Sequence, residues 1–307
     1  MCDRQEEGQQ HFPPCVSRVF ISSHLSISVR SDRQQSMSKI LCADVSGGLE
    51  NIPVSFANDV DDEPLPYFEQ YTATNVPGEG ACEDEFSNAY LPCKCATTCN
   101  SGCPCVLRSG HPYDSYGIVA VSSTLPIIEC SSLCRCASHG NCTNRVVQMG
   151  TRANLQVFKT TSGKRFGLRT LSPIRRGQYV TSYAGEVIGL DNARSRVGAM
   201  QELDSCYVIL VRESGTTTIV VDPSKVGNAG RFLNHSCNPN LVMIPVRTEC
   251  VVPELALFAT CDVSPFTELC FDYSGGSLEV REGLRKCCCG DVSCRGWLPY
   301  DKEVLGI

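Results

Sequence analysis

Nine cysteines between residues 93 and 142 have the type and spacing that bind metal ions. Spacers of one to five residues separate them, apart from one longer gap. Thiolates at such spacing are typical zinc ligands. The nine residues are Cys93, Cys95, Cys99, Cys103, Cys105, Cys130, Cys134, Cys136 and Cys142. Their pattern predicts a metal site rather than a scatter of buried or disulfide-bonded cysteines.

The number of sulfurs indicates what kind of metal site this is. Nine ligands do not divide into separate tetrahedral sites of four, but three zinc ions are satisfied if six thiolates bind one ion each and three bridge two. Such a triangular cluster is structural, because no coordination position stays open for a substrate. Nine thiolates (−9) and three divalent ions (+6) leave a charge of −3, so we expect N–H donors nearby. His139, inside the last spacer, is an alternative ligand.

The composition of the 307-residue chain is that of an ordinary globular protein. Hydrophobic residues make up 42% and charged residues 20% of the chain, and it has 22 cysteines. The N-terminus lacks the charge pattern of a secretory signal and no apolar run reaches about 18 residues, so we expect a soluble intracellular protein whose thiols are reduced. A net charge of −6 argues against direct DNA binding and favours a basic partner.

Seven apolar runs after residue 154 predict a mostly β domain. Each is short and lies between turn signals. The runs are 155–159, 166–170, 179–188, 206–211, 217–222, 241–247 and 254–260. One helix is predicted at about 190–202, with Asp191 or Asn192 as its N-cap. Residues 1 to about 75 have a polar start and an acidic stretch, DVDDEPLP at 59–66, which predict a poorly structured tail or a surface-wrapping arm.

Motifs along the chain together resemble those of SET-domain histone-lysine methyltransferases. They are NRVVQMG at 144–150, FGLRT at 166–170, YAGEV at 183–187, GRFLNHSCNPNL at 230–241, ELCFDYSG at 268–275 and a closing C-x-C-x4-C. The resemblance covers roughly residues 75 to 300. It implies a mostly β SET fold of small curved sheets with a knot-like C-terminal threading. The implied parts are an N-terminal extension at 1–75, partly disordered, a pre-SET three-zinc domain at 76–152, a SET domain at 153–276 and a post-SET zinc segment at 283–299.

The resemblance also implies a set of residues that bind S-adenosylmethionine. One group lies in the GRFLNHSC segment, a second in the loop 164–167, which we call the cofactor loop, and one more residue lies in the predicted strand 206–211. The set is Arg231, Phe232, Asn234, His235, Lys164, Arg165, Phe166 and Tyr207. Family members commonly have glycine where this chain has Arg165. If that position needs a positive φ, arginine there costs about 1 kcal/mol or more and weakens cofactor binding.

A second zinc site is implied at the C-terminal end. Cys287, Cys289 and Cys294 supply three thiolates, whereas a closed tetrahedral site needs four. By the resemblance Cys237 is the fourth ligand, which ties the cofactor segment to the C-terminal segment. The run CCC leaves Cys288 as an alternative to one of its neighbours.

The catalytic residues implied by the resemblance are aromatic. Tyr273 resembles the tyrosine that orients the target amine, Tyr183 a second tyrosine of the lysine channel, and Tyr207 a residue near both channel and cofactor. Methyl transfer to lysine is an in-line displacement that requires an uncharged amine. Phe271 occupies a position linked to the number of methyl groups added, and phenylalanine there leaves room for di- or trimethylation.

The predicted function is S-adenosylmethionine-dependent methylation of a histone H3 tail lysine, on the tail or the nucleosome, in the nucleus at the chromosome. Lysine 36 is favoured, and lysine 4 is an alternative. Lysine 9 is a further alternative, because the pre-SET arrangement also resembles that of lysine 9 enzymes. A catalytically silent chromatin-binding module and a zinc-dependent nucleic-acid binder are the competing interpretations. No membrane partner is expected.

Overall fold

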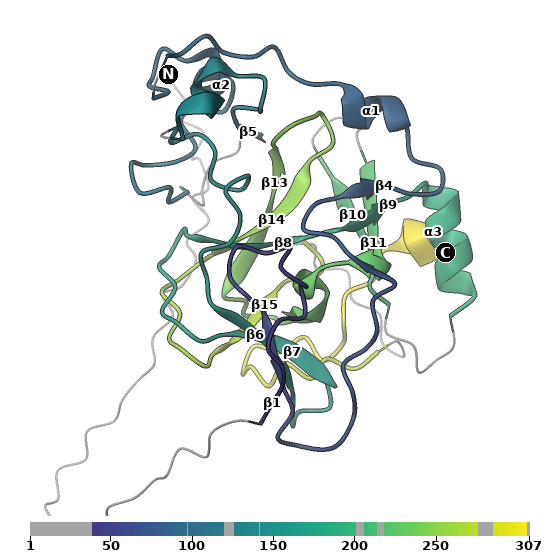
Figure 1. Cartoon of the computed structure of the whole chain (residues 1–307). Helices are drawn as coiled ribbons and strands as arrows, with labels where there is room; N and C mark the ends of the chain where they lie inside the picture. Colours follow the sequence, from purple (N-terminus) through teal and green to yellow (C-terminus); the bar gives the residue numbers. More distant parts are fainter. Residues whose placement is uncertain are drawn as a thin grey trace, which may run out of the picture. The chain divides into compact units, whose positions relative to one another are not determined.

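Three small β-sheets form the framework of the described chain (Figure 1). The computed structural model describes residues 39–96, 98–119, 126–140, 142–200, 206–213, 218–275 and 285–305. The predicted mostly β SET fold is confirmed, because more of these residues are in strands than in helices and the fold matches solved SET structures described below. No helix among the described residues is long and apolar enough to cross a membrane.

The largest sheet brings the predicted cofactor and catalytic segments together. Short strand β12 pairs in parallel with β15, so that His235 lies opposite Phe271. On its other edge β15 pairs with β7, which carries the end of the cofactor loop. In order across the sheet the strands are β1 (Ile40–Cys42), β2 (Ser55–Ala57), β6 (Leu155–Lys159), β7 (Phe166–Thr170), β15 (Glu268–Phe271) and β12 (Asn234–His235).

The strands of two further sheets alternate with these along the chain and contribute to the same core. One contains β5 (Ile127–Ile128), β13 (Leu241–Arg247), β14 (Glu254–Ala259) and β8 (Tyr179–Tyr183). The other contains β10 (Ile209–Arg212), β11 (Thr218–Gly227), β9 (Gly185–Val187) and β4 (Val76–Pro77), with β3 (Gln70–Tyr71) on β11. The predicted strands at 155–159, 166–170 and 241–247 are confirmed at both ends, and those near 209, 218 and 254 differ by a few residues.

The run 179–188 was predicted as one strand, and this is wrong. It forms β8 and β9, which belong to different sheets. The chain changes sheet at Ala184, where Gly185 approaches the backbone of Asp222 so closely that an added Cβ would lie 2.8 Å from the Asp222 carbonyl group. Only glycine permits that approach, which is why an uninterrupted apolar run is divided here.

The helix predicted at 190–202 is shorter and is capped differently. Helix α3 spans Leu190–Gly198, its N-cap is Gly189, and no side chain caps it. Asp191 instead lies in the first turn, where it pairs with Arg194 at 3.0 Å and its charge suits the helix N-terminus. Residues 201 and 202 lie outside the described part. Helix α4 (Lys302–Leu305) packs beside α3 (Figure 1).

Residues 39–75, which we call the arm, are part of the fold. We expected poor structure up to about residue 75, and from Ile40 onward this is wrong. Strand β2 pairs in parallel with β6, and Phe56 is only 3% exposed against Phe166, with ring centroids 5.9 Å apart. The arm buries few apolar residues, and two of them, Val54 and Phe56, belong to the core of the SET sheets. Residues 1–38 of the predicted extension lie outside the described residues.

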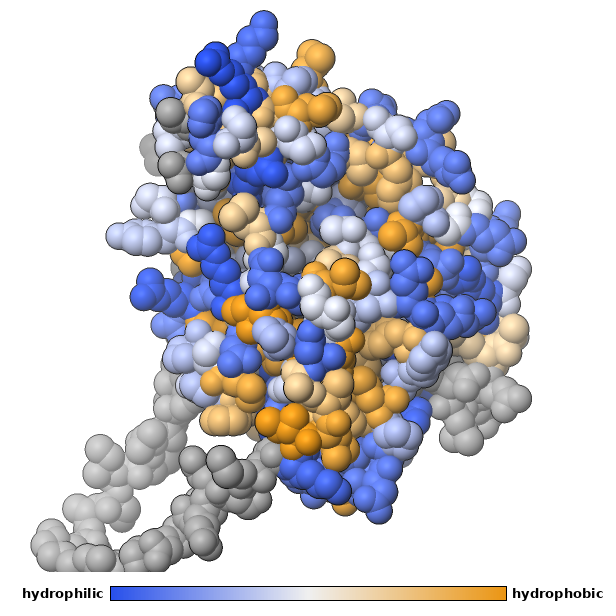
Figure 2. Space-filling view, in the orientation of Figure 1, coloured by the Kyte–Doolittle hydropathy of each residue, from blue (hydrophilic) through white to orange (hydrophobic). Residues whose placement is uncertain are grey.

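The cysteine-rich region has little other core. Helix α1 (Glu83–Ser87) buries no residue, and α2 (Pro104–Arg108) and the 3-10 helix η1 (Arg135–His139) bury mainly cysteines. The buried side chains that pack together here are seven cysteines and Val106. So little apolar material favours the prediction that metal binding stabilises this region. Figure 2 shows polar and apolar residues interspersed on the visible face, with orange groups toward the part where Figure 1 draws β1.

We predict that Phe56→Ala destabilises the protein by about 3 to 5 kcal/mol, because it removes a buried ring and leaves a cavity. Leu49→Ala, at an arm residue that is 59% exposed, should change stability by less than about 0.5 kcal/mol. Urea unfolding followed by circular dichroism measures both. Equal, small effects would show that the arm is only laid over the surface.

Candidate functional site

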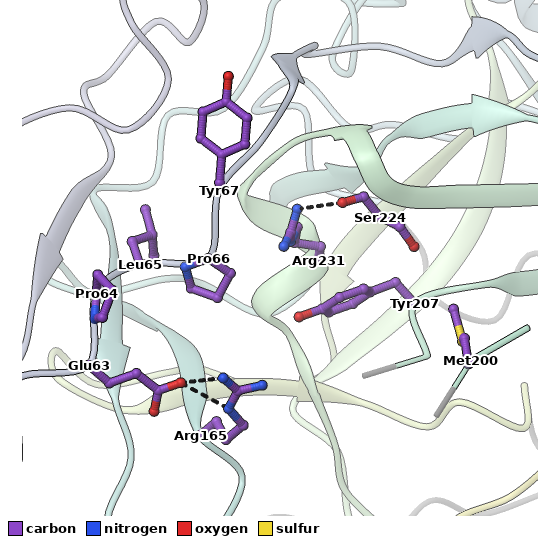
Figure 3. A pocket seen from close by; sticks show the side chains of 10 residues that line it. All are labelled: Glu63, Pro64, Leu65, Pro66, Tyr67, Arg165, Met200, Tyr207, Ser224 and Arg231. Atoms are coloured by element: carbon purple, nitrogen blue, oxygen red, sulfur yellow. Dashed lines mark hydrogen bonds and ion pairs between the residues drawn. The ribbon is translucent and has the colours of Figure 1, made fainter. Parts of the chain in front are cut away.

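A cavity of about 720 Å³ opens where the arm, the cofactor loop and the GRFLNHSC segment meet (Figure 3). Its volume is within the range of small-molecule sites. The lining residues are Glu63, Pro64, Leu65, Pro66, Tyr67, Arg165, Met200, Tyr207, Ser224 and Arg231. Three of the predicted cofactor residues therefore line one cavity.

Arg231 is the buried cation of this cavity. It belongs to the 3-10 helix η2 (Ala229–Phe232) and is 5% exposed. Its guanidinium lies 4.4 Å from the ring centroid of Phe68 and 4.7 Å from that of Tyr207, which stabilises the charge by cation–π contact. It donates to the backbone oxygen of Ser224 at 3.1 Å, but its Nε has no partner among the described residues. A buried donor without an acceptor suits a polar ligand group.

The other predicted cofactor residues lie outside the lining of the cavity. Asn234 donates through Nδ2 to the backbone oxygen of Phe166 at 2.8 Å and to Glu268 at 2.8 Å. Lys164 pairs with the same glutamate at 2.9 Å. Phe232 packs edge-on against the Phe166 ring, with centroids 6.2 Å apart. These residues fix the cofactor loop to the GRFLNHSC segment instead of reaching into the cavity.

The backbone at Arg165 has the conformation that glycine favours. Its φ is +64°, one of three positive values at non-glycine residues in the described chain. Residue 165 therefore has the positive φ at which a residue with a Cβ is unfavourable, and arginine at this position is strained. The strain is opposed by Glu63, which accepts from Arg165 Nε at 3.0 Å and also from Nη2.

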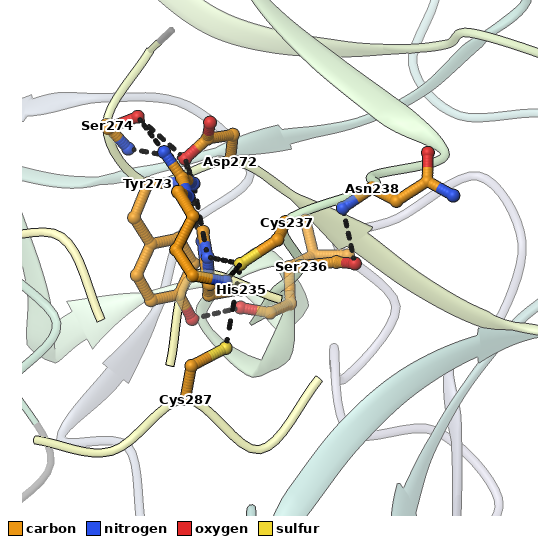
Figure 4. Close-up of polar contacts among 10 residues, drawn as sticks. His235, Ser236, Cys237, Asn238, Asp272, Tyr273, Ser274 and Cys287 are labelled. Carbon is orange, nitrogen blue, oxygen red and sulfur yellow. Dashed lines mark hydrogen bonds and ion pairs between the residues drawn. The ribbon is translucent and has the colours of Figure 1, made fainter. Parts of the chain in front are cut away.

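His235 lies between the catalytic segment and a cysteine sulfur (Figure 4). Its Nδ1 accepts from the Tyr273 backbone N–H at 3.2 Å, and its Nε2 lies 3.4 Å from Cys237 Sγ. Burial lowers the pKa of His235 to about 4, although Asp272 opposes the shift. The imidazole is therefore neutral at physiological pH and links Tyr273 to Cys237.

The predicted catalytic aromatics form one contiguous set. The rings of Phe271 and Tyr273 lie 4.8 Å apart and those of Tyr183 and Phe271 6.1 Å apart. Tyr183 donates to the backbone oxygen of Tyr207 at 2.5 Å, and Tyr273 donates to that of Leu233 at 2.7 Å. Burial raises the pKa of both the Tyr183 and Tyr273 phenols, so both keep their protons at neutral pH.

Cys237, Cys287, Cys289 and Cys294 form a second cysteine group, which we call the post-SET cluster. Their sulfurs all lie within 4.8 Å of one another, and Cys237 and Cys287 are 3.9 Å apart. A tetrahedral zinc with Zn–S bonds of about 2.3 Å places sulfurs about 3.8 Å apart, so these four residues fit zinc. The backbone N–H of Arg295 donates to Cys237 Sγ at 3.3 Å. Cys288 is exposed and outside the group.

Sulfurs of the first cysteine group also converge. Within the described chain, seven of the nine cysteines belong to sets of four close sulfurs, and Cys134 and Cys142 belong to none of these sets. Sulfur pairs lie at 3.5 Å (Cys99 and Cys130), 3.6 Å (Cys93 and Cys136) and 3.9 Å (Cys105 and Cys134). Three overlapping sets of four sulfurs share Cys93, as expected when thiolates bridge ions. The Cys93 N–H donates to Cys134 Sγ at 3.3 Å, the kind of donor that the excess charge requires. Among the described residues His139 belongs to none of these sets.

Comparison with known proteins agrees with this geometry. Residues 165–274 match the family described as SET domain, and residues 46–145 match the Pre-SET motif. The histone-lysine N-methyltransferase SETMAR of Bos taurus is 43% identical over 282 residues, which are 85% of this chain and 90% of that protein.

The chain belongs to the SET-domain family of histone-lysine methyltransferases.

Solved SET structures are similar over most of the chain. The crystal structure of the methyltransferase domain of human SETMAR has a TM-score of 0.75 at 40% identity and covers 84% of this chain and 98% of its own. That of Arabidopsis thaliana SUVH6 in complex with SAM has a TM-score of 0.73 at 29% identity, over 87% and 57% of the two chains. The SET framework of this enzyme is thus confirmed by sequence and by structure.

Sequence reasoning missed the part of the SET-domain site that the arm supplies. Glu63 and the segment 64–67 line the cavity, and Phe68 lies against Arg231. Tyr71 accepts from the Ala229 N–H at 3.2 Å and donates to Glu50 at 2.9 Å. The stretch DVDDEPLP was noticed for its acidity, and its alternating prolines and apolar residues were the available signal of a fixed wall.

We predict that Cys289→Ser lowers the zinc content of this SET enzyme by one ion per chain, because it removes one of four ligands. Cys288→Ser is the matched control and should leave the metal content unchanged. Inductively coupled plasma mass spectrometry on the purified full chain measures both. Loss of one ion in Cys288→Ser, with retention in Cys289→Ser, would reverse the ligand assignment.

Proposed function

We propose that this enzyme transfers methyl groups from S-adenosylmethionine to a lysine of the histone H3 tail, with lysine 36 as the favoured target. The observation that carries the proposal is the cavity in which Arg165, Tyr207 and Arg231 converge, where the buried Nε of Arg231 has no partner within the described part of the chain. SUVH6, a relative of the same fold, was solved with SAM. The proposed enzyme acts at chromatin in the nucleus.

The residues around the cavity fit the cofactor. The Arg231 guanidinium would hold an acceptor group of the cofactor, and the Tyr207 ring would pack against it. When bound, S-adenosylmethionine supplies an electrophilic methyl group on a sulfonium. The chain's own task is then to hold donor and acceptor in line, and positioning supplies much of the rate of such a reaction.

Tyr273 and Tyr183 are the proposed residues of the lysine channel. The Tyr273 hydroxyl donates its proton to the Leu233 carbonyl, which leaves its oxygen lone pairs free to orient an amine N–H. Because burial raises the pKa of this phenol, Tyr273 is a poor base in its resting state. The substrate lysine, with an ordinary pKa of about 10.4, therefore loses its proton to solvent on the way into the channel.

The net charge of the chain supports a basic tail as substrate. Charge complementarity between a protein of charge −6 and a tail rich in lysine and arginine speeds their encounter. We further propose three zinc ions in the first cysteine group and one in the post-SET cluster, and we retain the division into pre-SET (76–152), SET (153–276) and post-SET (283–299) parts. Residues 276 and 283, which bound two of these parts, lie outside the described residues.

We predict that the full chain transfers labelled methyl from S-adenosylmethionine to nucleosomes or free histone H3, and that Tyr273→Phe lowers the rate by at least about 100-fold through loss of amine orientation. Mass spectrometry of the modified peptide identifies the lysine. A product at lysine 9 or lysine 4 would correct the target. Absence of label from folded, zinc-loaded protein would instead support the silent chromatin-binding module.

We predict that the wild-type enzyme produces dimethyl or trimethyl lysine and that Phe271→Tyr shifts the product toward monomethyl. The Phe271 ring is 2% exposed and lies between the rings of Tyr183 and Tyr273. A phenol there adds a polar group that holds water in the channel and reduces the room for a methylated amine. Peptide mass spectrometry at matched turnover measures the product ratio. Only monomethyl product from the wild type would contradict the proposal.

A further inference from the structure

We propose that Glu63, an arm residue, is a positioning residue for the cofactor loop: through its ion pair with Arg165 it holds residue 165 in the left-handed conformation and so keeps the cofactor cavity formed. The inference rests on the proposed function, because it assumes that the cofactor occupies this cavity. It assigns a role in the reaction to a residue that precedes the matched SET segment 165–274 by about a hundred positions.

The loop needs an external restraint because of its sequence. A φ of +64° at Arg165 is unfavourable for any residue with a Cβ, so an unrestrained loop would relax toward negative φ. That relaxation would rotate the adjoining peptide groups. The next residue, Phe166, presents its backbone oxygen to Asn234 at 2.8 Å, so the rotation would also disturb the contact that joins the loop to the GRFLNHSC segment.

Glu63 contacts the Arg165 guanidinium through one carboxylate oxygen. Its Oε1 accepts from Arg165 Nε at 3.0 Å and also from Nη2 of the same guanidinium. Both side chains line the cavity, and Figure 3 shows the pair at its lower edge, beside the prolines of the arm. The pair therefore joins two walls of the cavity that come from distant parts of the sequence.

The pair is partly exposed, so its strength depends on what fixes the carboxylate. The Arg165 side chain is 54% exposed, and an isolated exposed ion pair contributes little. Glu63, however, also pairs with Lys159, whose side chain is only 7% exposed. Asp61 pairs with the same ammonium at 3.1 Å. A buried lysine thus anchors the arm, and the anchored Glu63 restrains Arg165.

The anchoring lysine lies against the core. Lys159 ends strand β6, and its ammonium lies 4.8 Å from the centroid of the Phe166 ring, which packs in the core. The hydrogen bond from Lys159, together with that from Arg165, lowers the pKa of Glu63, so its carboxylate is charged at neutral pH. The four charged groups form a network on one side of the loop, and networks are the ion pairs that contribute measurably.

The test is steady-state kinetics of the full chain with S-adenosylmethionine varied. Glu63→Gln, which keeps the shape and removes the charge, should raise KM for the cofactor about threefold to fivefold, with kcat changed less than twofold. Asp62→Asn is the matched control: it removes the same charge from the neighbouring exposed residue and should leave both constants unchanged. Thermal unfolding of each variant verifies that it is folded.

A second variant separates positioning from general stability. In Arg165→Gly the backbone adopts positive φ without strain, so adding Glu63→Gln to it should raise KM no further. If Glu63→Gln raises KM equally in both backgrounds, or in neither, the inference is wrong. Because the wild type is measured in the same assay, absence of methyl transfer by the wild type would overturn the proposed function instead.

Discussion

Four consecutive residues, 234 to 237, hold three parts of the molecule in register. Asn234 binds the backbone of the cofactor loop, His235 accepts from the Tyr273 N–H, and Cys237 joins the post-SET cluster. The parallel pairing of β12 with β15 holds this segment in place. The cofactor loop, the aromatic set and the C-terminal cysteines therefore all contact this one short segment, and a shift of the segment would displace all three.

Burial keeps the centre of the site uncharged and leaves the charges at its edges. His235 is neutral because desolvation lowers its pKa, whereas desolvation raises the pKa of the Tyr183 and Tyr273 phenols, which keep their protons. Arg231 is the exception, and three aromatic rings surround it. A neutral channel favours an uncharged amine, whereas the ion pairs at the rim fix the walls. This division of roles follows from the high desolvation penalty of ions.

The arm shows how a polar segment becomes part of a site. It buries few side chains, but Phe56 enters the core, Phe68 stacks on Arg231 and Tyr71 binds the start of η2. Backbone pairing of β3 with β11 adds to these contacts. The arm is therefore held by many separate contacts with the SET sheets rather than by a core of its own, and this explains why composition predicted no structure for it.

The sequence by itself determined the features that depend on local pattern and count. Apolar runs bounded by turns identified β6, β7 and β13, and cysteine spacing identified the first cysteine group. The family resemblance added Cys237 to the second group and marked Arg165 as a position where glycine is usual. Only the tertiary structure decided which sheet each strand joins, that residues 179–188 divide at Gly185, and that Glu63 meets Arg165. These are contacts between residues far apart in the chain, and no periodicity records them. Packing and charge pairing in three dimensions select them.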